Sequence, residues 1–335
     1  LQTVRDLVVL GKPLIVTIRK RRYVCKHCNA TFTEENPYIK RYCHFPNRLY
    51  IESLTESFRL QSFTSVAKRL GVSVTSIIRW FDKLNCPHPK LPECIAIDEF
   101  RGNAGGEKFQ CNVADPVKHQ VIDILPSRNT EDLCKHFLEY PYKERAEVKK
   151  IVMDLSTLFR SVAKTMFPEV KIVADKFHVI RVVINSLENV RKRIQKEFHA
   201  TKRKWFKRSR YLLLKPEYKL TSEDKIELAR MLNSSYDLEK AYVLKERFYE
   251  VFRKQTRTEA KKELGKWLLL AADLSLPEFQ HCITTFSNWK TEIANIIGER
   301  VSNGFIEGSN NKIKVLKRIS YGVRNFNRFR NRILY

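Results

Sequence analysis

Hydrophobic positions from Arg48 to Leu84 recur at the three- and four-residue spacing of α-helices. Within this stretch, residues 63–80 (FTSVAKRLGVSVTSIIRW) have the spacing of a helix-turn-helix motif. Gly71 permits the tight turn, Ala67 lies where the two helices touch, and Ser73 is placed to cap the second helix. The pattern predicts a small core made of Val66, Leu70, Val72 and Ile77.

The second helix of such a motif presents its exposed face to the major groove of DNA. Here that face carries Thr75, Ser76 and Arg79. An ordinary pair of core helices is the alternative, and the basic residues around the motif favour DNA binding over it. The stretch PHPKLP at 87–92 then breaks any helix and marks a linker.

After the linker the hydrophobic period changes from 3.6 to about 2, which predicts strands. Three strands follow one another closely, and then helices alternate with two short apolar strands. The segments, in order, are 94–100, 108–115, 119–126, 130–140 (helix), 149–154, 157–167 (helix), 170–175 and a helix from Phe177. Short, wholly apolar strands are covered on both faces. The pattern therefore predicts three antiparallel strands leading into two parallel ones, which is the order of an α/β ribonuclease-H-like fold.

The chain beyond Phe177 is predicted to be helical for more than a hundred residues. Further helices are expected at 222–255 and 258–298, with a break near Leu276-Pro277. The intensely basic stretch before them contains Trp205. This ring is a candidate for stacking on a distorted DNA end, but large aromatic side chains in basic helices are more often packing anchors.

The amino-acid composition indicates which type of partner the protein binds. Lys and Arg number 63 and Asp and Glu 37, giving a net charge of +26, while 43% of the 335 residues are hydrophobic. Such a chain folds, so it is not a disordered basic tail. DNA or RNA is the leading partner for this surplus charge, and a membrane surface is the lesser one. No apolar run approaches 18 residues and the N-terminus lacks signal-peptide features, so we expect a soluble intracellular protein without a membrane partner.

Eight cysteines are present, and only Cys25 and Cys28 have the spacing of metal ligands. Their surroundings, RRYVCKHCNATF, are similar to one knuckle of a zinc ribbon, whose Zn²⁺ needs four ligands. Cys43 and His44 are candidates for the other two, although a ribbon normally brings them from a separate hairpin, here expected upstream of residue 1. A pair of reduced structural thiols is the equally weighted alternative.

Two aspartates follow apolar residues in strands that are otherwise expected to be buried, Asp98 in AIDEF and Asp154 in IVMDL. In the predicted fold the first strand lies beside the fourth, so these carboxylates should meet. A buried, unpaired carboxylate is costly without a cationic partner. Converging carboxylates of this kind hold the two Mg²⁺ or Mn²⁺ ions of phosphodiester chemistry.

Asp175 is the alternative to Asp154 as the second acid of the metal site, because it also ends a strand that is expected to be buried. The fifth strand lies next to the fourth and not next to the first, so we place Asp175 outside the metal site. With His178 it forms D-x2-H, which suggests a supporting or packing pair at the junction of strand and helix.

A third acid should come from a helix that returns to the sheet, and Glu307 is the candidate. Asn303 or Ser302 is placed to cap this helix. The positions that follow on the face of Glu307 are amides and cations, as expected of a metal ligand beside a phosphate track: Asn310, Asn311, Lys314, Lys317 and Arg318. The alternative is a solvated basic face on which Glu307 pairs with its neighbours.

Together these residues resemble the ISL-three family of bacterial insertion-sequence transposases. The resemblance is carried by the half ribbon at 21–35, the helix-turn-helix, AIDEFRG, and the long strings at 151–181 and 302–333. It implies that the DDE catalytic triad falls on Asp98, Asp154 and Glu307, and that D-x2-H corresponds to a signature of related transposases. It also implies double-stranded DNA as partner (transposon ends and target), assembly as a homo-oligomer on DNA, and work in the bacterial cytoplasm.

The long interval between Asp154 and Glu307 implies a helical insertion. The expected parts are a partial ribbon at 1–46, the helix-turn-helix at 47–86, the catalytic domain at 93–180 and 299–335, and the insertion at 181–298. Family members carry a first C-x2-C upstream that is absent here, which puts the zinc site in doubt. A non-enzymatic DNA-binding regulator, an inactive truncated transposase, and a metal-dependent nuclease or resolvase are the competing functions.

Overall fold

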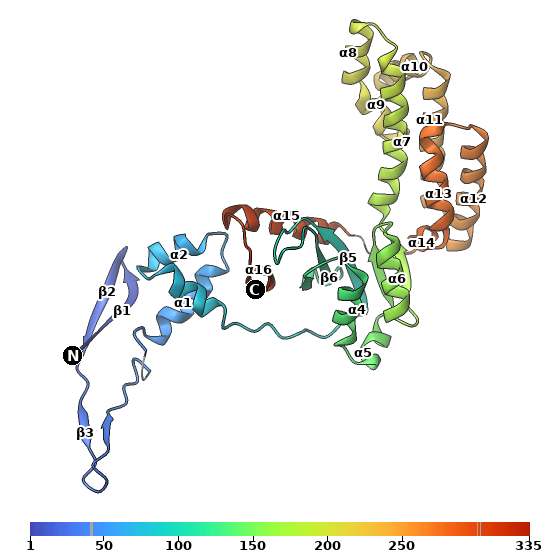
Figure 1. The fold of residues 1–335 in the computed structure, drawn as a ribbon. Coiled ribbons are helices and arrows are strands. Elements are labelled where there is room, and N and C mark those ends of the chain that lie inside the picture. The colour runs from blue at the N-terminus through green and yellow to red at the C-terminus, as the bar shows by residue number, and fades with distance from the viewer. Residues whose placement is uncertain (41–42, 300, 302) are drawn as a thin grey trace.

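The computed structural model describes residues 1–40, 43–299, 301 and 303–335. Figure 1 shows an elongated molecule with two small hairpins at the N-terminal end, a three-helix unit, an α/β body, and a helical bundle that projects from the far side of that body. Over the described residues, none of the helices combines the length and the apolar character needed to cross a lipid bilayer.

The N-terminal region consists of two separate antiparallel hairpins. Strands β1 (Gln2–Val9) and β2 (Lys12–Ile18) form the first, and β3 (Arg22–Val24) and β4 (Thr31–Thr33) form the second. The C-x2-C segment forms the tip of the second hairpin, where the Cys25 amide donates to the Ala30 carbonyl oxygen.

The predicted helix-turn-helix is confirmed. Helices α1 (Asn47–Ser57), α2 (Phe63–Leu70) and α3 (Val74–Phe81) enclose a small core in which Leu49 joins the predicted apolar residues. Gly71 between α2 and α3 has φ of +63°, a conformation that favours glycine. The Ser73 hydroxyl accepts a hydrogen bond from the Ser76 amide at 3.1 Å and caps α3 as expected.

The body is a five-stranded mixed sheet of order β7-β6-β5-β8-β9. Its strands are β5 (Cys94–Phe100), β6 (Gln110–Asp115), β7 (Gln120–Leu125), β8 (Lys150–Met153) and β9 (Lys171–Ala174). Strand β5 is antiparallel to β6 and parallel to β8, and β8 is parallel to β9. The predicted arrangement of three antiparallel and two parallel strands, with the first beside the fourth, is therefore confirmed.

Helices connect these strands and continue into the bundle. Helix α7 starts at the end of β9 and runs into the bundle, so it crosses the expected boundary at 180/181. The helices, including three short 3₁₀ turns (η), are α4 (Thr130–Leu138), α5 (Tyr142–Glu147), α6 (Thr157–Met166), α7 (Lys176–Lys196), α8 (Ala200–Arg208), α9 (Arg210–Leu214), η1 (Glu217–Lys219), α10 (Ser222–Leu232), α11 (Tyr236–Tyr249), η2 (Glu250–Arg253), α12 (Arg257–Asp273), η3 (Pro277–Phe279), α13 (Gln280–Asn288) and α14 (Lys290–Ala294).

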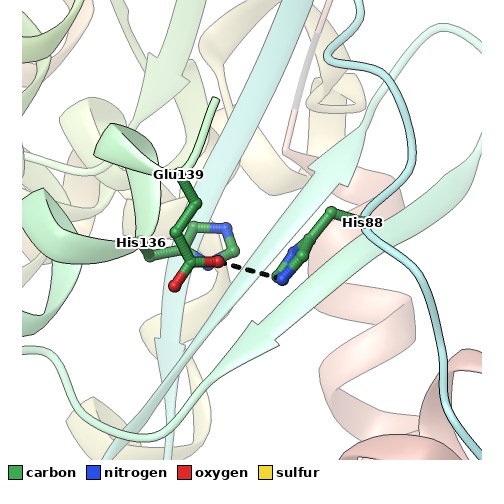
Figure 2. A group of neighbouring side chains, drawn as sticks. All are labelled: His88, His136 and Glu139. Carbon is green, nitrogen blue, oxygen red and sulfur yellow. Dashed lines mark ion pairs between the residues drawn. The ribbon is translucent and has the colours of Figure 1, made fainter. Parts of the chain in front are cut away.

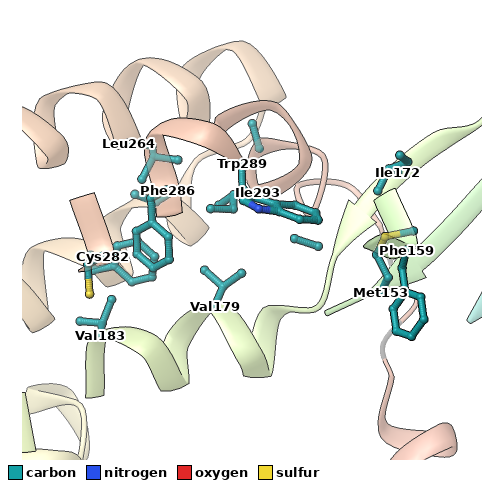
Figure 3. Packing of buried hydrophobic residues seen from close by; sticks show 14 of the residues in the cluster. Met153, Phe159, Ile172, Val179, Val183, Leu264, Cys282, Phe286, Trp289 and Ile293 are labelled. Atoms are coloured by element: carbon teal, nitrogen blue, oxygen red, sulfur yellow. The ribbon is translucent and has the colours of Figure 1, made fainter. Parts of the chain in front are cut away.

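One continuous hydrophobic core joins the sheet to the bundle. Met153 and Phe159 from the body belong to the same buried cluster as Val179, Phe286 and Trp289 from the bundle (Figure 3). Because apolar burial is the main favourable contribution to folding, this shared core fixes the bundle against the parallel edge of the sheet.

Trp205 belongs to the bundle's packing and not to an open surface. Its ring is partly buried, meets Phe206 edge-on at 5.1 Å between ring centres, and its indole N–H donates to Glu227. This is the packing-anchor interpretation of the ring.

The chain finally returns to the body through α15 (Gly304–Ile319) and α16 (Phe326–Leu334). Helix α15 packs on β5 and β6, and α16 packs on β7. A helix that closes over the sheet after the long bundle is what the sequence predicted for the segment around Glu307.

Candidate active site

Asp98, inside β5, lies beside Asp154, which directly follows the end of β8. In the parallel register of β5 and β8, Ile97 is paired with Met153. Asp98 directly follows Ile97, and Asp154 directly follows Met153. The predicted strand order thus brings these two carboxylates together.

Burial raises the pKa of both carboxyl groups, and repulsion from neighbouring acids adds to the shift of each. Burial raises the pKa of Asp98 to about 6, and the adjacent Asp154 adds to this shift. Burial also raises the pKa of Asp154, against which nearby His178 acts. Asp98 accepts hydrogen bonds from the Glu99 amide at 2.9 Å and from the Asn310 side chain at 2.8 Å, both neutral donors. The pair is therefore a desolvated, electron-rich site suited to a cation.

Helix α15 reaches this pair through Asn310. The amide nitrogen of Asn310 donates to Asp98, and its oxygen accepts from Asn112 of β6 at 2.9 Å. Asn112 stands opposite Asp98 in the β5–β6 register. These two hydrogen bonds, from Asn112 to Asn310 and from Asn310 to Asp98, hold one carboxylate oxygen in place. They were not predicted from the sequence. Their signal in the sequence was the polar Asn112 between Cys111 and Val113, and Gln110 in the same strand made that signal weak.

Glu307 lies one turn before Asn310, among a different set of neighbours. Ligand atoms of Glu307, Asp175 and His178 all lie within 4.8 Å of one another. Among the described residues, Asp98, Asp154 and Glu307 do not form a group that tight. The structure thus brings Asp98 to Asp154, and Glu307 to the D-x2-H pair.

Asp175 caps the N-terminus of α7. It is 3% exposed, its side chain accepts from the His178 amide, and its Oδ2 lies 2.7 Å from Nδ1 of the same histidine. The hydrogen bond that His178 donates to Asp175 raises the pKa of His178, and the charges of Asp154 and Asp98 act in the same direction. The imidazolium is therefore favoured at a place surrounded by acids.

The predicted stripe on α15 needs a correction. Asn310 is 5% exposed and turned to the sheet, because its amide is engaged by Asp98 and Asn112, so it is not part of a DNA-facing surface. Asn311, Lys314 and Arg318 are exposed, while half-buried Lys317 donates to the Arg101 carbonyl oxygen at 3.2 Å.

The predicted cap of α15 also differs. Asn303 stands at the N-cap, but its side chain makes no capping hydrogen bond, and both of its amide atoms are buried without a partner among the described residues. The other predicted cap, Ser302, lies outside the described residues.

Two more predicted sites lie at the N-terminal end. On α3, Thr75 and Arg79 are exposed and Ser76 is half-buried, with its hydroxyl 2.8 Å from that of Ser73. At the second hairpin, hydrogen bonds from backbone amides of His27 and Cys28 lower the pKa of the Cys25 thiol. This favours the thiolate that zinc requires. Among the described residues, neither Cys43 nor His44 joins these two cysteines in a metal-compatible group of three.

A transposase family model matches residues 95–333, which cover the sheet, the bundle and both returning helices. The chain belongs to the ISL3 (ISL-three) family of transposases. Two further models of the family match the N-terminal part: its helix-turn-helix domain over residues 34–85, and the zinc finger of the IS204, IS1001, IS1096 and IS1165 transposases over residues 2–28.

Curated relatives agree with this ISL3 assignment. The chain is 25% identical over 330 residues to the transposase for insertion sequence element IS1001 of Bordetella parapertussis, covering 96% of this chain and 80% of that one. It is also 25% identical over 253 residues to the transposase for IS1557 of Mycobacterium tuberculosis, where it spans 56% of the relative. A shorter match, 37% identical over 94 residues, is to a Lactococcus lactis protein named ATP-dependent protease, and it covers only 28% of this transposase.

Proposed function

We propose that this ISL3 member is a DDE transposase that binds the terminal inverted repeats of its insertion sequence and catalyses metal-dependent strand cleavage and strand transfer. Asp98, Asp154 and Glu307 are the proposed catalytic acids, in a ribonuclease-H-like domain interrupted by the helical bundle. The observation that carries the proposal is the desolvated pair of Asp98, within β5, and Asp154, directly after β8, inside the region that matches the transposase model.

The residues fit a pair of hard divalent ions. Asp98 and Asp154 offer carboxylate oxygens, the ligand type that Mg²⁺ and Mn²⁺ prefer, and burial disfavours their charged forms unless a cation is present. When bound, such ions supply Lewis acidity that activates a nucleophile and stabilises the charge on a phosphodiester in an in-line displacement.

The chain's own contribution is to fix these groups. Asn310 orients Asp98, as the two hydrogen bonds of its amide require. Asp175 holds His178 at 2.7 Å, and His178 in turn faces Glu307. We assign Asp175 and His178 the role of supporting Glu307, with the positive charge of His178 offsetting part of the negative charge of the three acids.

DNA is proposed to lie along two basic surfaces. Thr75, Ser76 and Arg79 of α3 face the major groove, beside a groove to which Lys40 and Lys83 add positive charge. Asn311, Lys314, Lys317 and Arg318 of α15 follow the phosphates next to the acids. Joining two transposon ends needs two copies of the site, so the working form is a homo-oligomer on DNA.

Arg79→Ala is expected to weaken binding of an end-containing duplex by about tenfold, because a base-edge contact contributes roughly 1–3 kcal/mol. Fluorescence anisotropy at fixed salt measures the dissociation constants for this duplex and for a scrambled one. Lys262→Ala, at an exposed position of α12, is the matched loss of one charge. Equal weakening by both variants would mean that Arg79 contributes only net charge.

The proposed chemistry is tested with a labelled duplex that contains the transposon end and an unlabelled target duplex, with and without Mn²⁺. Cleavage followed by joining is expected only with the ion. Cleavage without joining would point to a nuclease or resolvase. Binding without cleavage in Mg²⁺ or Mn²⁺ would point to a DNA-binding regulator or an inactive copy.

A further inference from the structure

A second cluster of metal-ligating side chains lies away from the acids, between the linker and the sheet. His88 comes from the linker after α3, His136 from the last turn of α4, and Glu139 from the residue that directly follows α4 (Figure 2). One ligand atom from each of the three lies within 4.8 Å of the others, and Nε2 of His88 is 2.9 Å from a Glu139 carboxylate oxygen.

We propose that His88, His136 and Glu139 form a zinc site that fastens the linker of the helix-turn-helix to the catalytic body. Zinc is the ion that two imidazoles and one carboxylate favour, with a tetrahedral arrangement whose fourth position is open to water. Hard Mg²⁺ prefers an all-oxygen set, which the Asp98 site offers and this cluster does not.

An independent observation points to a ligand at this place. His136 is 8% exposed, and its Nε2 is buried without a hydrogen-bond partner among the described residues. A buried polar nitrogen left without a partner destabilises the folded protein. A metal ion held between the two imidazoles and Glu139 removes this penalty.

The charges around the cluster suit one divalent ion. The nearest other carboxylate is Asp123 of β7, which is 1% exposed and lies 3.4 Å from Nδ1 of His88 and 3.8 Å from Nε2 of His136. Arg330 of α16 offsets this charge through hydrogen bonds of 2.5 and 3.0 Å. Asp123 is placed to orient the His88 ring, as carboxylates beside metal-bound histidines commonly do.

On the C-terminal side of His88 the linker is held by Leu91, whose side chain is 3% exposed and packs in the main hydrophobic core. The Leu91 amide donates to Glu144 at 2.6 Å, and Lys90 pairs with Glu147 at 2.8 Å on the surface. Surface ion pairs of this type contribute little. A metal bond at His88 would therefore fix the part of the linker between α3 and Leu91 against the end of α4.

The test uses the full chain with Cys25→Ser and Cys28→Ser, so that the ribbon thiols do not bind metal. Equilibrium dialysis against micromolar Zn²⁺ in excess Mg²⁺, which competes for the acidic site, followed by atomic absorption, should give one zinc more per chain than the same chain with His88→Gln. Adding His88→Gln or Glu139→Gln should weaken the zinc affinity by at least about 100-fold, because each removes a proposed ligand and even the loss of a residue that supports a ligand costs about 10–100-fold. Both side chains are largely exposed, so the fold is retained.

His281→Gln, an exposed histidine of α13, is the matched control and should keep the zinc. Cobalt in place of zinc should give the visible bands of a tetrahedral site without a thiolate charge-transfer band. Absence of zinc from the doubly substituted chain, or unchanged affinity in the His88→Gln variant, would overturn the proposal. No DNA enters this assay, so its outcome is independent of the proposed transposase chemistry.

Discussion

Replacing Asp98 by asparagine should lower DNA cleavage by at least about 10³-fold while binding of an end-containing duplex stays within about twofold. A factor of 10³ corresponds to about 4 kcal/mol of barrier, which is the scale of the charge stabilisation that a metal ion supplies. The substitution keeps the shape of the side chain, so the packing of β5 is preserved. It removes the negative charge that attracts the divalent ions.

The local structure makes this variant informative. Asp98 accepts from the Asn310 amide nitrogen, and an asparagine at position 98 still offers one oxygen to that donor. The link between β5 and α15 is thus expected to survive, and loss of activity would not reflect a displaced helix. Cleavage is measured on a labelled end-containing duplex in Mg²⁺ and in Mn²⁺, with binding by anisotropy on the same samples.

Glu99→Gln is the matched control on the adjacent position of the same strand. Glu99 is bonded to Arg128 at 2.5 Å near the surface, so its loss removes an ion pair of small value. We expect near-normal cleavage from this variant. Cleavage retained by Asp98→Asn, or lost equally in both variants, would contradict the assignment of Asp98.

Local patterns were enough to predict the parts of the fold that depend on short stretches of chain. The helix-turn-helix follows from apolar spacing around Gly71, and the strands follow from alternating and continuous apolar runs. The order of the sheet also followed, because few topologies place two buried parallel strands after three antiparallel ones. Asp98 and Asp154 were found for this reason: each ends its apolar run at a position that the strand order makes adjacent.

Contacts between distant segments were not predictable in the same way. Asn310 has the helical spacing of a surface stripe, yet it is buried because α15 is rotated to bring it against Asp98 and Asn112. The proximity of Glu307 to Asp175 and His178 depends on how α15 meets the start of α7. Neither orientation is encoded in a spacing rule.

Residues 308–335 contain eight basic and no acidic residues, a count that by itself suggests a positively charged surface. Part of this tail does not face solvent: Arg328 pairs with Asp82, Arg330 pairs with buried Asp123, and Arg332 is 3% exposed. Their partners come from earlier parts of the chain, so the tail holds the DNA-binding unit and the sheet together. The surplus charge available to DNA is smaller than the sequence count suggests.

Arg332 has a purely structural environment. Its guanidinium donates to the carbonyl oxygens of Ser57, Arg59 and Gln61, at the end of α1 and in the loop before α2, and to the Ser320 hydroxyl. It also lies 4.8 Å from the centre of the Phe63 ring. Burial lowers the pKa of Arg332 to about 10, so the group stays charged at neutral pH. One side chain thus joins α16 to the helix-turn-helix.

Arg332→Met is therefore expected to destabilise the protein by about 3 kcal/mol, because the three carbonyl groups lose a charged donor while the new side chain fills similar space. Calorimetry should show the lowest-melting transition shifted down by about 5 °C or more. Arg324→Met, at an exposed position of the same tail, is the matched control and should leave that transition within about 1 °C.

The predicted loss of stability concerns the contact between α16 and the helix-turn-helix and not catalysis, and the two effects can be measured separately. At a temperature well below the transition, Arg332→Met should still cleave an end-containing duplex at a measurable rate, because Arg332 contacts none of the proposed acids. Its affinity for the duplex should become more temperature-dependent as the helix-turn-helix detaches from α16. An unshifted transition would show that the bonds of Arg332 to Ser57, Arg59 and Gln61 do not hold the two parts together.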